Sequence, residues 1–291
     1  MNLSRIYFLL LLGAIVLSFA GDTVPGQILV RKNINFRSAV EDRLKKHGLR
    51  LDNVCPVDVN SAAHRIFSDY GAIFLSNADD RLPTRCIFDN ETEVAEFQGS
   101  LETSTAIIAG TSITLRKAAM DALLAARQEA IEKHLDISPR GGPTASKRTF
   151  TETVKLWNSR FWPGLEHWVT LKRISRKDAD AAKDSAIPEQ VERVLDWEKN
   201  GLYFSKDFSK SILYSVAAPG ASQHIFLLAL DVEQYGNSNV RAILAKHGWF
   251  QTVKSDMPHF TYLGVSEDKL PKLGLRAANV GEQKFWIPDF E

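Results

Sequence analysis

Apolar residues recur at helical spacing in several parts of the chain. Residues 36–47 and 61–70 each carry apolar and charged side chains at that spacing, and Gly48 stands where the first helix would end. The clearest pattern covers residues 115–133, and its apolar stripe consists of Leu115, Ala119, Leu123, Ala126 and Ala130. We interpret this stripe as the core-facing side of a helix.

Short apolar runs bounded by polar residues predict strands. These runs cover residues 72–75, 105–108, 212–216 and 249–253. Further helices are expected over residues 151–157, over most of 175–199 and over 240–247, with Asn239 as the cap of the last. Pro163 and Gly164 form a turn signal. The pattern therefore predicts a mixture of helices and strands without an internal repeat.

The composition is that of an ordinary globular protein. The chain has 291 residues, of which 44% are hydrophobic and 24% charged, enough for one large domain or two small ones. The formal net charge is +1, so no global basic field favours binding to nucleic acid. We therefore expect no nucleic-acid partner.

Residues 1–20 have the pattern of a secretory signal peptide. Arg5 supplies a positive charge, and the apolar run over residues 6–16 is too short to span a bilayer comfortably. Ser18 and Ala20 are small residues at the positions that a signal peptidase reads, so we predict cleavage after Ala20. The alternative is an uncleaved membrane anchor. After cleavage the protein would be exported, periplasmic or extracellular, without stable membrane insertion.

The chain has two cysteines, Cys55 and Cys86. In an exported protein such a pair suggests a disulfide, which would stabilise the fold by about 3–4 kcal/mol on the chain-entropy model. Two separate buried thiols are the alternative.

Candidate chemistry is concentrated between Pro219 and Tyr262. His224 and Asp231 are seven positions apart, and Asp256 precedes His259 by three. Two imidazoles and a carboxylate can hold a catalytic Zn²⁺ with one position open for water, and a second carboxylate could take a proton from that water. The spacing alone is a weak signal because no His-Glu-x-x-His helix is present. A buried strand over residues 225–232, flanked by polar residues, is the alternative.

Arg148 follows a loop rich in glycine, proline and serine. An arginine in this position is usually a solvated surface charge. It can also clamp a carboxylate, because guanidinium is a planar donor with two prongs.

Three motifs in this order resemble the zinc D-Ala-D-Ala carboxypeptidases and dipeptidases of the VanY and VanX kind. The family's Ser-x-His-x-x-Gly-x-Ala-x-Asp is similar to the stretch from Ser222 to Asp231, which follows Pro219-Gly220. Its later Glu-x-Trp-His-Phe is similar to residues 256–260, and its earlier Tyr-Arg-Ser to residues 147–149. The resemblance covers roughly residues 105–264.

The resemblance implies a role for each matching residue. The zinc ligands would be His224, Asp231 and His259. Asp256 stands where the family has its glutamate general base, and Arg148 stands where an arginine binds and polarises the substrate. Ser222 stands where a serine contacts the substrate. The implied activity is hydrolysis of cell-wall peptides that contain D-amino acids, with one zinc ion as cofactor.

The resemblance also implies a fold and a division of the chain. The family has a small α+β domain in which helices flank an antiparallel sheet, a fold shared with Hedgehog signalling domains. Residues 105–291 would form this catalytic domain, and residues 21–104 would be an N-terminal α/β extension.

Three positions depart from the family pattern. Asp256 replaces glutamate and is one methylene shorter, and Pro258 replaces tryptophan. Leu227 replaces the motif glycine. Because His224 and Asp231 have opposite strand parity, the segment needs a bend, which Leu227 must make with negative φ or under strain.

Two other functions stay open. A zinc-containing binding module would keep the metal and lose the base, and a metal-free exported structural protein would need neither. The peptide bond that is cut and the oligomeric state do not follow from these residues.

Overall fold

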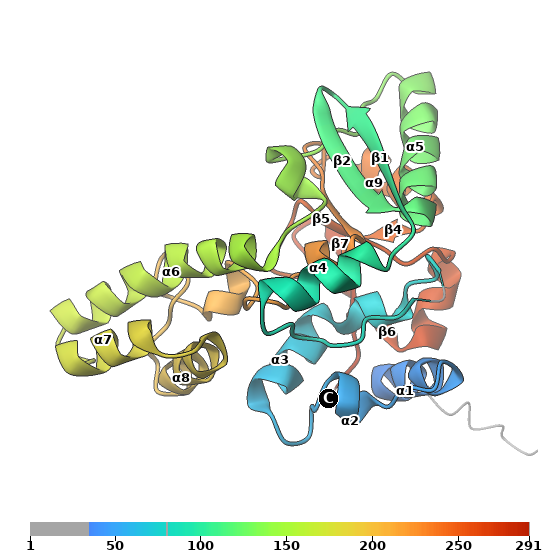
Figure 1. Ribbon diagram of the computed structural model, residues 1–291. Helices are drawn as coiled ribbons and strands as arrows, with labels where there is room; N and C mark the ends of the chain where they lie inside the picture. The colour runs from blue at the N-terminus through green and yellow to red at the C-terminus, as the bar shows by residue number, and fades with distance from the viewer. Residues whose placement is uncertain (1–34, 80, 291) are drawn as a thin grey trace, which may run out of the picture. The chain divides into compact units, whose positions relative to one another are not determined.

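The computed structural model describes residues 35–79 and 81–290, which form helices and a smaller number of short antiparallel strands (Figure 1). The α-helices are α1 (Phe36–Lys46), α2 (Leu51–Val54), α3 (Ser61–Tyr70), α4 (Glu91–Gly99), α5 (Lys117–Glu132), α6 (Phe150–Thr170), α7 (Arg176–Asp184), α8 (Ile187–Lys199) and α9 (Ser238–Lys246). Short 3₁₀ helices are η1 (Gly71–Leu75), η2 (Gly142–Ala145), η3 (Ile212–Tyr214), η4 (Gln223–Phe226) and η5 (Glu267–Leu273).

The strands form small antiparallel sheets. They are β1 (Thr103–Ile108), β2 (Thr111–Arg116), β3 (Ala229–Asp231), β4 (Trp249–Phe250), β5 (His259–Tyr262), β6 (Leu275–Val280) and β7 (Gln283–Pro288). In the described part of the chain, β3, β5 and β4 make a three-stranded sheet in that order, while β1–β2 and β6–β7 are hairpins. The protein therefore belongs to the α+β class, as expected.

The helices with the clearest sequence signals are confirmed. Helix α5 buries Ala119, Leu123 and Ala126 completely, and it lies beside the β1–β2 hairpin in Figure 1. Helix α1 begins where the Asn35 side chain accepts a hydrogen bond from the Ser38 backbone, and α3 begins in the same way at Asn60. Apolar periodicity and a capping side chain thus agree at both helices.

Two of the predicted strands are wrong. Residues 72–75 belong to η1, and residues 212–214 form η3. A short apolar run is compatible with either a strand or a buried helical turn, so the pattern did not discriminate. At η3 the Ser211 hydroxyl accepts a hydrogen bond from the Leu213 backbone, which favours the helical turn.

Helix α6 is much longer than predicted, because it continues through Pro163 and Gly164. It begins with a capping box in which Thr149 and Glu152 satisfy each other's backbone N–H groups. Pro163 cannot donate to the Ser159 carbonyl, which accepts instead from the Arg160 side chain at 3.2 Å. A Cβ atom at Gly164 would come within 2.3 Å of Phe204, so this glycine permits close packing and not a turn.

The other departures are smaller. Asn237, and not Asn239, caps α9, because its side chain accepts from the backbone N–H groups of Asn239 and Val240. The strand expected over residues 249–253 is limited to β4, and the polar tail contains the β6–β7 hairpin, which was not predicted.

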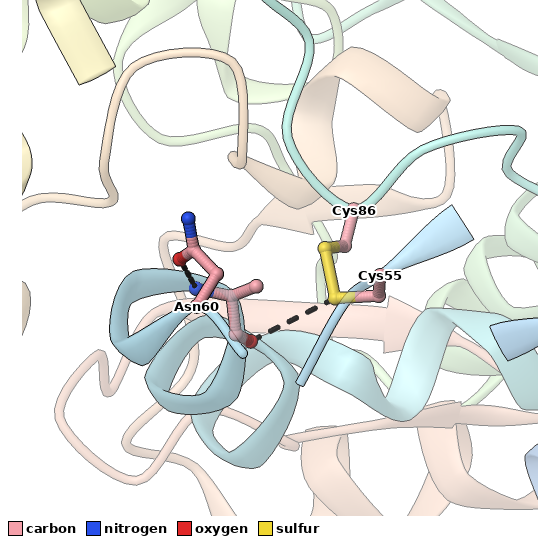
Figure 2. The surroundings of a disulfide bond; sticks show 4 residues. Cys55, Asn60 and Cys86 are labelled. Carbon is pink, nitrogen blue, oxygen red and sulfur yellow. Dashed lines mark hydrogen bonds between the residues drawn. A yellow bond between two sulfur atoms is a disulfide. The ribbon is translucent and has the colours of Figure 1, made fainter. Parts of the chain in front are cut away.

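The predicted disulfide is confirmed: Cys55 is bonded to Cys86. Figure 2 shows the bridge between the end of α2 and the segment that leads to α4, beside Asn60 at the start of α3. The Cys55 sulfur also lies 3.7 Å from the Ala63 carbonyl oxygen. This is a van der Waals contact and not a hydrogen bond, because a disulfide sulfur carries no proton. The bridge agrees with an oxidising compartment. The predicted signal peptide lies outside the described residues, and within them no helix is long and apolar enough to cross a membrane.

Candidate metal centre

The structure brings the three predicted metal ligands together. One ligand atom each from His224, Asp231 and His259 lies within 4.8 Å of the others. The Asp231 Oδ1 atom is 3.4 Å from His224 Nε2 and 3.2 Å from His259 Nδ1. Both imidazoles are buried, with 1% and 4% of their surface exposed. This group could hold a metal ion.

Strand pairing explains why two of these residues meet. Asp231 ends β3 and His259 begins β5, and the two are direct partners in the antiparallel register. Side chains of such partners lie on the same face of a sheet, about 5 Å apart at Cβ. The sheet therefore fixes Asp231 against His259 although 28 positions separate them in the chain.

His224 reaches the same point through a tight bend. It lies in η4, and Leu227 then adopts the left-handed conformation, with φ of 54°. The continuous strand considered over residues 225–232 is wrong in its first part, since β3 begins only at Ala229. The bend is thus made at the position where the resembling family has glycine, and the leucine side chain makes that conformation cost roughly 1–2 kcal/mol.

Arg116 fixes the backbone of this bend through hydrogen bonds. Its Nε atom donates to the Phe226 carbonyl at 2.9 Å, and its backbone N–H donates to the Leu227 carbonyl at 3.0 Å. The guanidinium is buried and is paired with Asp79 at 2.9 Å. A buried arginine with fixed partners can therefore offset the strain at Leu227.

Residues from the first third of the chain also fix the centre. The Gln98 side chain, on α4, donates to the Arg148 carbonyl at 2.9 Å and to the Ile225 carbonyl at 3.0 Å. The Tyr70 carbonyl, at the end of α3, accepts from Gln223 Nε2 at 2.7 Å. The domain boundary between residues 104 and 105 stays a prediction, but these contacts cross it.

Gln223 determines which nitrogen of His259 carries the proton. Because Gln223 Nε2 donates to the Tyr70 carbonyl, its Oε1 atom must face His259 and Thr261. This oxygen accepts from His259 Nε2 at 2.9 Å and from the Thr261 hydroxyl at 2.5 Å. A neutral His259 therefore keeps its proton on Nε2 and directs the lone pair of Nδ1 at the Asp231 carboxylate. Two electron-rich atoms facing each other indicate a site for a cation.

His224 gives the second indication of a cation site. Neither of its ring nitrogens has a hydrogen-bond partner among the described residues, although the side chain is buried. Burial lowers the pKa of His224 to about 4, and the charge of Arg148 acts in the same direction against that of Asp231. The imidazole is thus neutral near pH 7, which is the form that binds metal. Buried polar atoms in proteins almost always have a partner, so two without one require an explanation.

Arg148 orients the carboxylate. Its Nη2 atom donates to Asp231 Oδ2 at 2.9 Å and its Nε atom donates to the Thr144 carbonyl at 3.1 Å, which leaves Asp231 Oδ1 for the two imidazoles. Burial raises the pKa of Asp231, but the interactions with His224 and His259 outweigh it and hold the pKa well below its usual value. Nη1 of Arg148 has no hydrogen bond to any described residue. Arg148 therefore both orients Asp231 and retains a donor that no described residue engages.

A cavity of about 190 Å³ opens at this centre. Its lining includes His224, His259, Arg148, Ser222 and Asp256, so the predicted base and both predicted substrate contacts share one space. Asp256 has an exposed surface, yet loss of water around its carboxyl group raises the pKa of that group, and the charge of Asp231 adds to this effect against His259. The Asp256 carbonyl accepts from the His259 backbone at 3.2 Å, which fixes Asp256 beside His259.

The predicted site residues therefore come together in one place. Arg116, Gln98 and the role of Gln223 were not predicted from the sequence. Gln98 follows Phe97, and an amide beside a core residue needs fixed partners, which was a usable signal. Gln223, between Ser222 and His224, gave no such signal. Comparisons with protein-family models, curated proteins and solved structures find no match to this chain.

Proposed function

We propose that the protein is an exported zinc-dependent peptidase that hydrolyses peptides containing D-amino acids, such as those of bacterial cell walls. One observation carries the proposal. His224, a buried imidazole whose ring nitrogens have no hydrogen-bond partner among the described residues, has a nitrogen within 4.8 Å of ligand atoms of Asp231 and His259. Asp256 and Arg148 line the cavity at this group. We also propose that the protein has the fold of the zinc D-Ala-D-Ala carboxypeptidases that its motifs resemble.

The donor set favours zinc. Two neutral imidazoles and one carboxylate form a known three-ligand set for catalytic zinc, in which a fourth position stays open. Donors about 2.0–2.1 Å from a tetrahedral ion lie about 3.3 Å from one another. The separations of Asp231 Oδ1 from the two imidazole nitrogens, 3.4 and 3.2 Å, agree with this spacing.

Asp256 would act as the general base beside the metal. When bound, a zinc ion polarises a carbonyl group and acidifies water. Asp256, beside His259, accepts the proton of the attacking water and passes it to the leaving amine. Its raised pKa favours this exchange because a carboxyl group that binds protons more readily is a better general base.

Arg148 and Ser222 contribute to substrate binding. The free Nη1 atom of Arg148 can donate to the substrate's carbonyl or terminal carboxylate while Nη2 keeps hold of Asp231. Ser222 is buried in the wall of the cavity, where its hydroxyl can contact the same peptide. A small peptide end that carries a carboxylate fits these donors.

The experiment uses purified protein and a cell-wall pentapeptide that ends in D-Ala-D-Ala. We expect release of D-Ala or of the dipeptide, seen by mass spectrometry, to stop on chelation and to return with one equivalent of zinc. Asp256→Asn should lower kcat by about a hundredfold or more with zinc content unchanged, as loss of a general base does. Activity that resists chelation would refute the proposal. Tight zinc without turnover would favour a binding module.

A further inference from the structure

A second and larger cavity adjoins the candidate metal centre. It has a volume of about 480 Å³ and shares Tyr214, Val253 and Ser255 with the lining of the first cavity. Tyr214 has 48% of its surface exposed at the boundary between the two spaces. A peptide that enters the first cavity can therefore continue into the second, which is built from α3, the segment before Asp256 and the end of β7.

Basic side chains predominate in this second cavity. His64, Arg65, Lys254 and Arg276 line it, against Asp69 as the one lining carboxylate among the described residues. Arg65 is neutralised by Asp69, with Nε and Oδ2 2.5 Å apart. Lys254 is exposed, and within residues 35–79 and 81–290 it has no ion pair and no side-chain hydrogen bond.

The charge of Arg276 is also only partly neutralised. Arg276 is 3.5 Å from Asp289, and more than half of each side chain is exposed, so water screens this pair strongly. The cavity therefore has an excess of positive charge centred on Lys254. An anionic group is the ligand that would compensate it.

Aromatic rings give the cavity a firm apolar wall. The Phe290 ring packs on the edge of Phe67 at 4.8 Å and against His64 at 5.0 Å, so its orientation is fixed. The Arg65 guanidinium lies 5.9 Å from the centre of the Tyr214 ring. Apolar walls beside an unpaired ammonium group suit a short aliphatic stem that ends in a carboxylate.

We propose that this cavity is a subsite for a carboxylate-bearing side chain of the peptide substrate, and that Lys254 is its specificity-determining contact. This inference rests on the proposed peptidase function. Lys254 lies two positions before Asp256 in the chain. An acidic residue held by Lys254 therefore anchors the peptide next to the base and leaves its end at the metal centre.

The first test measures binding without catalysis. Two labelled peptides that end in D-Ala-D-Ala, identical except for one glutamate or glutamine upstream, are titrated against metal-free protein by fluorescence anisotropy. We expect the acidic peptide to bind about tenfold more tightly, as a charge-assisted hydrogen bond allows. Lys254→Gln should remove the preference, whereas Lys177→Gln, the same change on the exposed face of α7, should keep it.

The second test repeats the comparison with zinc-loaded protein and measures kcat/KM. The same preference should appear, mainly through KM, and should be lost in Lys254→Gln. Turnover with equal kcat/KM for both peptides would overturn the subsite and leave the peptidase intact. A Lys254-dependent preference in binding without any turnover would support the subsite and refute the peptidase. Equal binding of both peptides by the wild-type protein would refute the subsite in either case.

Discussion

Two clusters in this protein combine histidine with a carboxylate, and they differ in what neutralises the acid. Near the surface, Glu129 accepts from Lys133 at 2.7 Å, from Lys246 at 2.8 Å and from His247 at 2.9 Å. These donors lower the pKa of Glu129 to about 2. At the buried centre, Asp231 faces two imidazoles and a single arginine, and one of those imidazoles, His224, has no hydrogen-bond partner among the described residues.

The comparison shows that residue types alone do not make a metal site. The surface cluster already contains its cations, so a further ion would have to displace lysines from Glu129. At the buried centre, the ring nitrogens of His224 instead have no hydrogen-bond partner among the described residues, and a divalent ion would bind His224 together with Asp231 and His259.

Removal of a ligand should give the largest difference between the two clusters. We expect His224→Ala to weaken zinc binding by about a thousandfold, because a tetrahedral site loses one of three protein donors. His247→Ala is the matched control and should bind zinc like the wild type. Competition titration with a coloured chelator measures both. An equal loss in the two variants would place the ion elsewhere.

The next largest difference between the two clusters should be their contribution to the pH dependence of the free energy of unfolding. In metal-free protein His224 has a pKa of about 4, below the 6.5 of an unperturbed histidine. At His224 the unfolded chain therefore binds more protons between these values, and the contribution of His224 to the free energy of unfolding should fall by about 3 kcal/mol as pH drops from 6.5 to 4. The raised pKa of Asp256 acts in the opposite direction. The contribution of Asp231, whose pKa is lowered, is lost only at still lower pH.

Denaturant unfolding at several pH values in the presence of a chelator measures this loss. His224→Gln removes the titrating group and should make the free energy of unfolding less dependent on pH in that window. His247→Gln, at the surface cluster, should keep the wild-type dependence. A wild-type slope in His224→Gln would mean that another group titrates.

Loss of the group that orients His259 should weaken zinc binding less than loss of a ligand. Gln223→Ala removes the acceptor that keeps the proton of His259 on Nε2, and loss of such a partner typically weakens metal binding by about 10–100-fold. The fold should persist, so circular dichroism should match the wild type while zinc affinity falls. Unchanged affinity would show that His259 needs no orienting partner.

The smallest effect belongs to the surface cluster. His247→Ala removes one of three partners of Glu129, and water screens partly exposed pairs of this kind, so the loss of stability should be small. Thermal unfolding at low and high salt should show a slight loss that salt reduces. A larger loss would mean that this cluster supports the fold more than its exposure suggests.

Much of the fold could be predicted from local patterns. Helix α5 follows from its apolar stripe, although Leu115, the first residue of the predicted stripe, belongs to β2 and the helix begins at Lys117. Helix α3 follows from an apolar face that begins after the cap Asn60. The disulfide could be predicted because Cys55 has only Cys86 as a possible partner in this chain. The short runs that became η1 and η3 could not, since burial in a helical turn and in a strand selects the same apolar residues.

The amino-acid sequence defines which chemical groups are available at the centre: the imidazoles of His224 and His259, the carboxylates of Asp231 and Asp256, and the guanidinium of Arg148. Their shared location follows from the fold, because the β3–β5 register and the bend at Leu227 bring them together. The fold also decided which nitrogen of His259 faces Asp231, through Gln223 and Tyr70, which are 153 positions apart. Hydrogen bonds over such separations depend on the complete fold, and no local pattern encodes them.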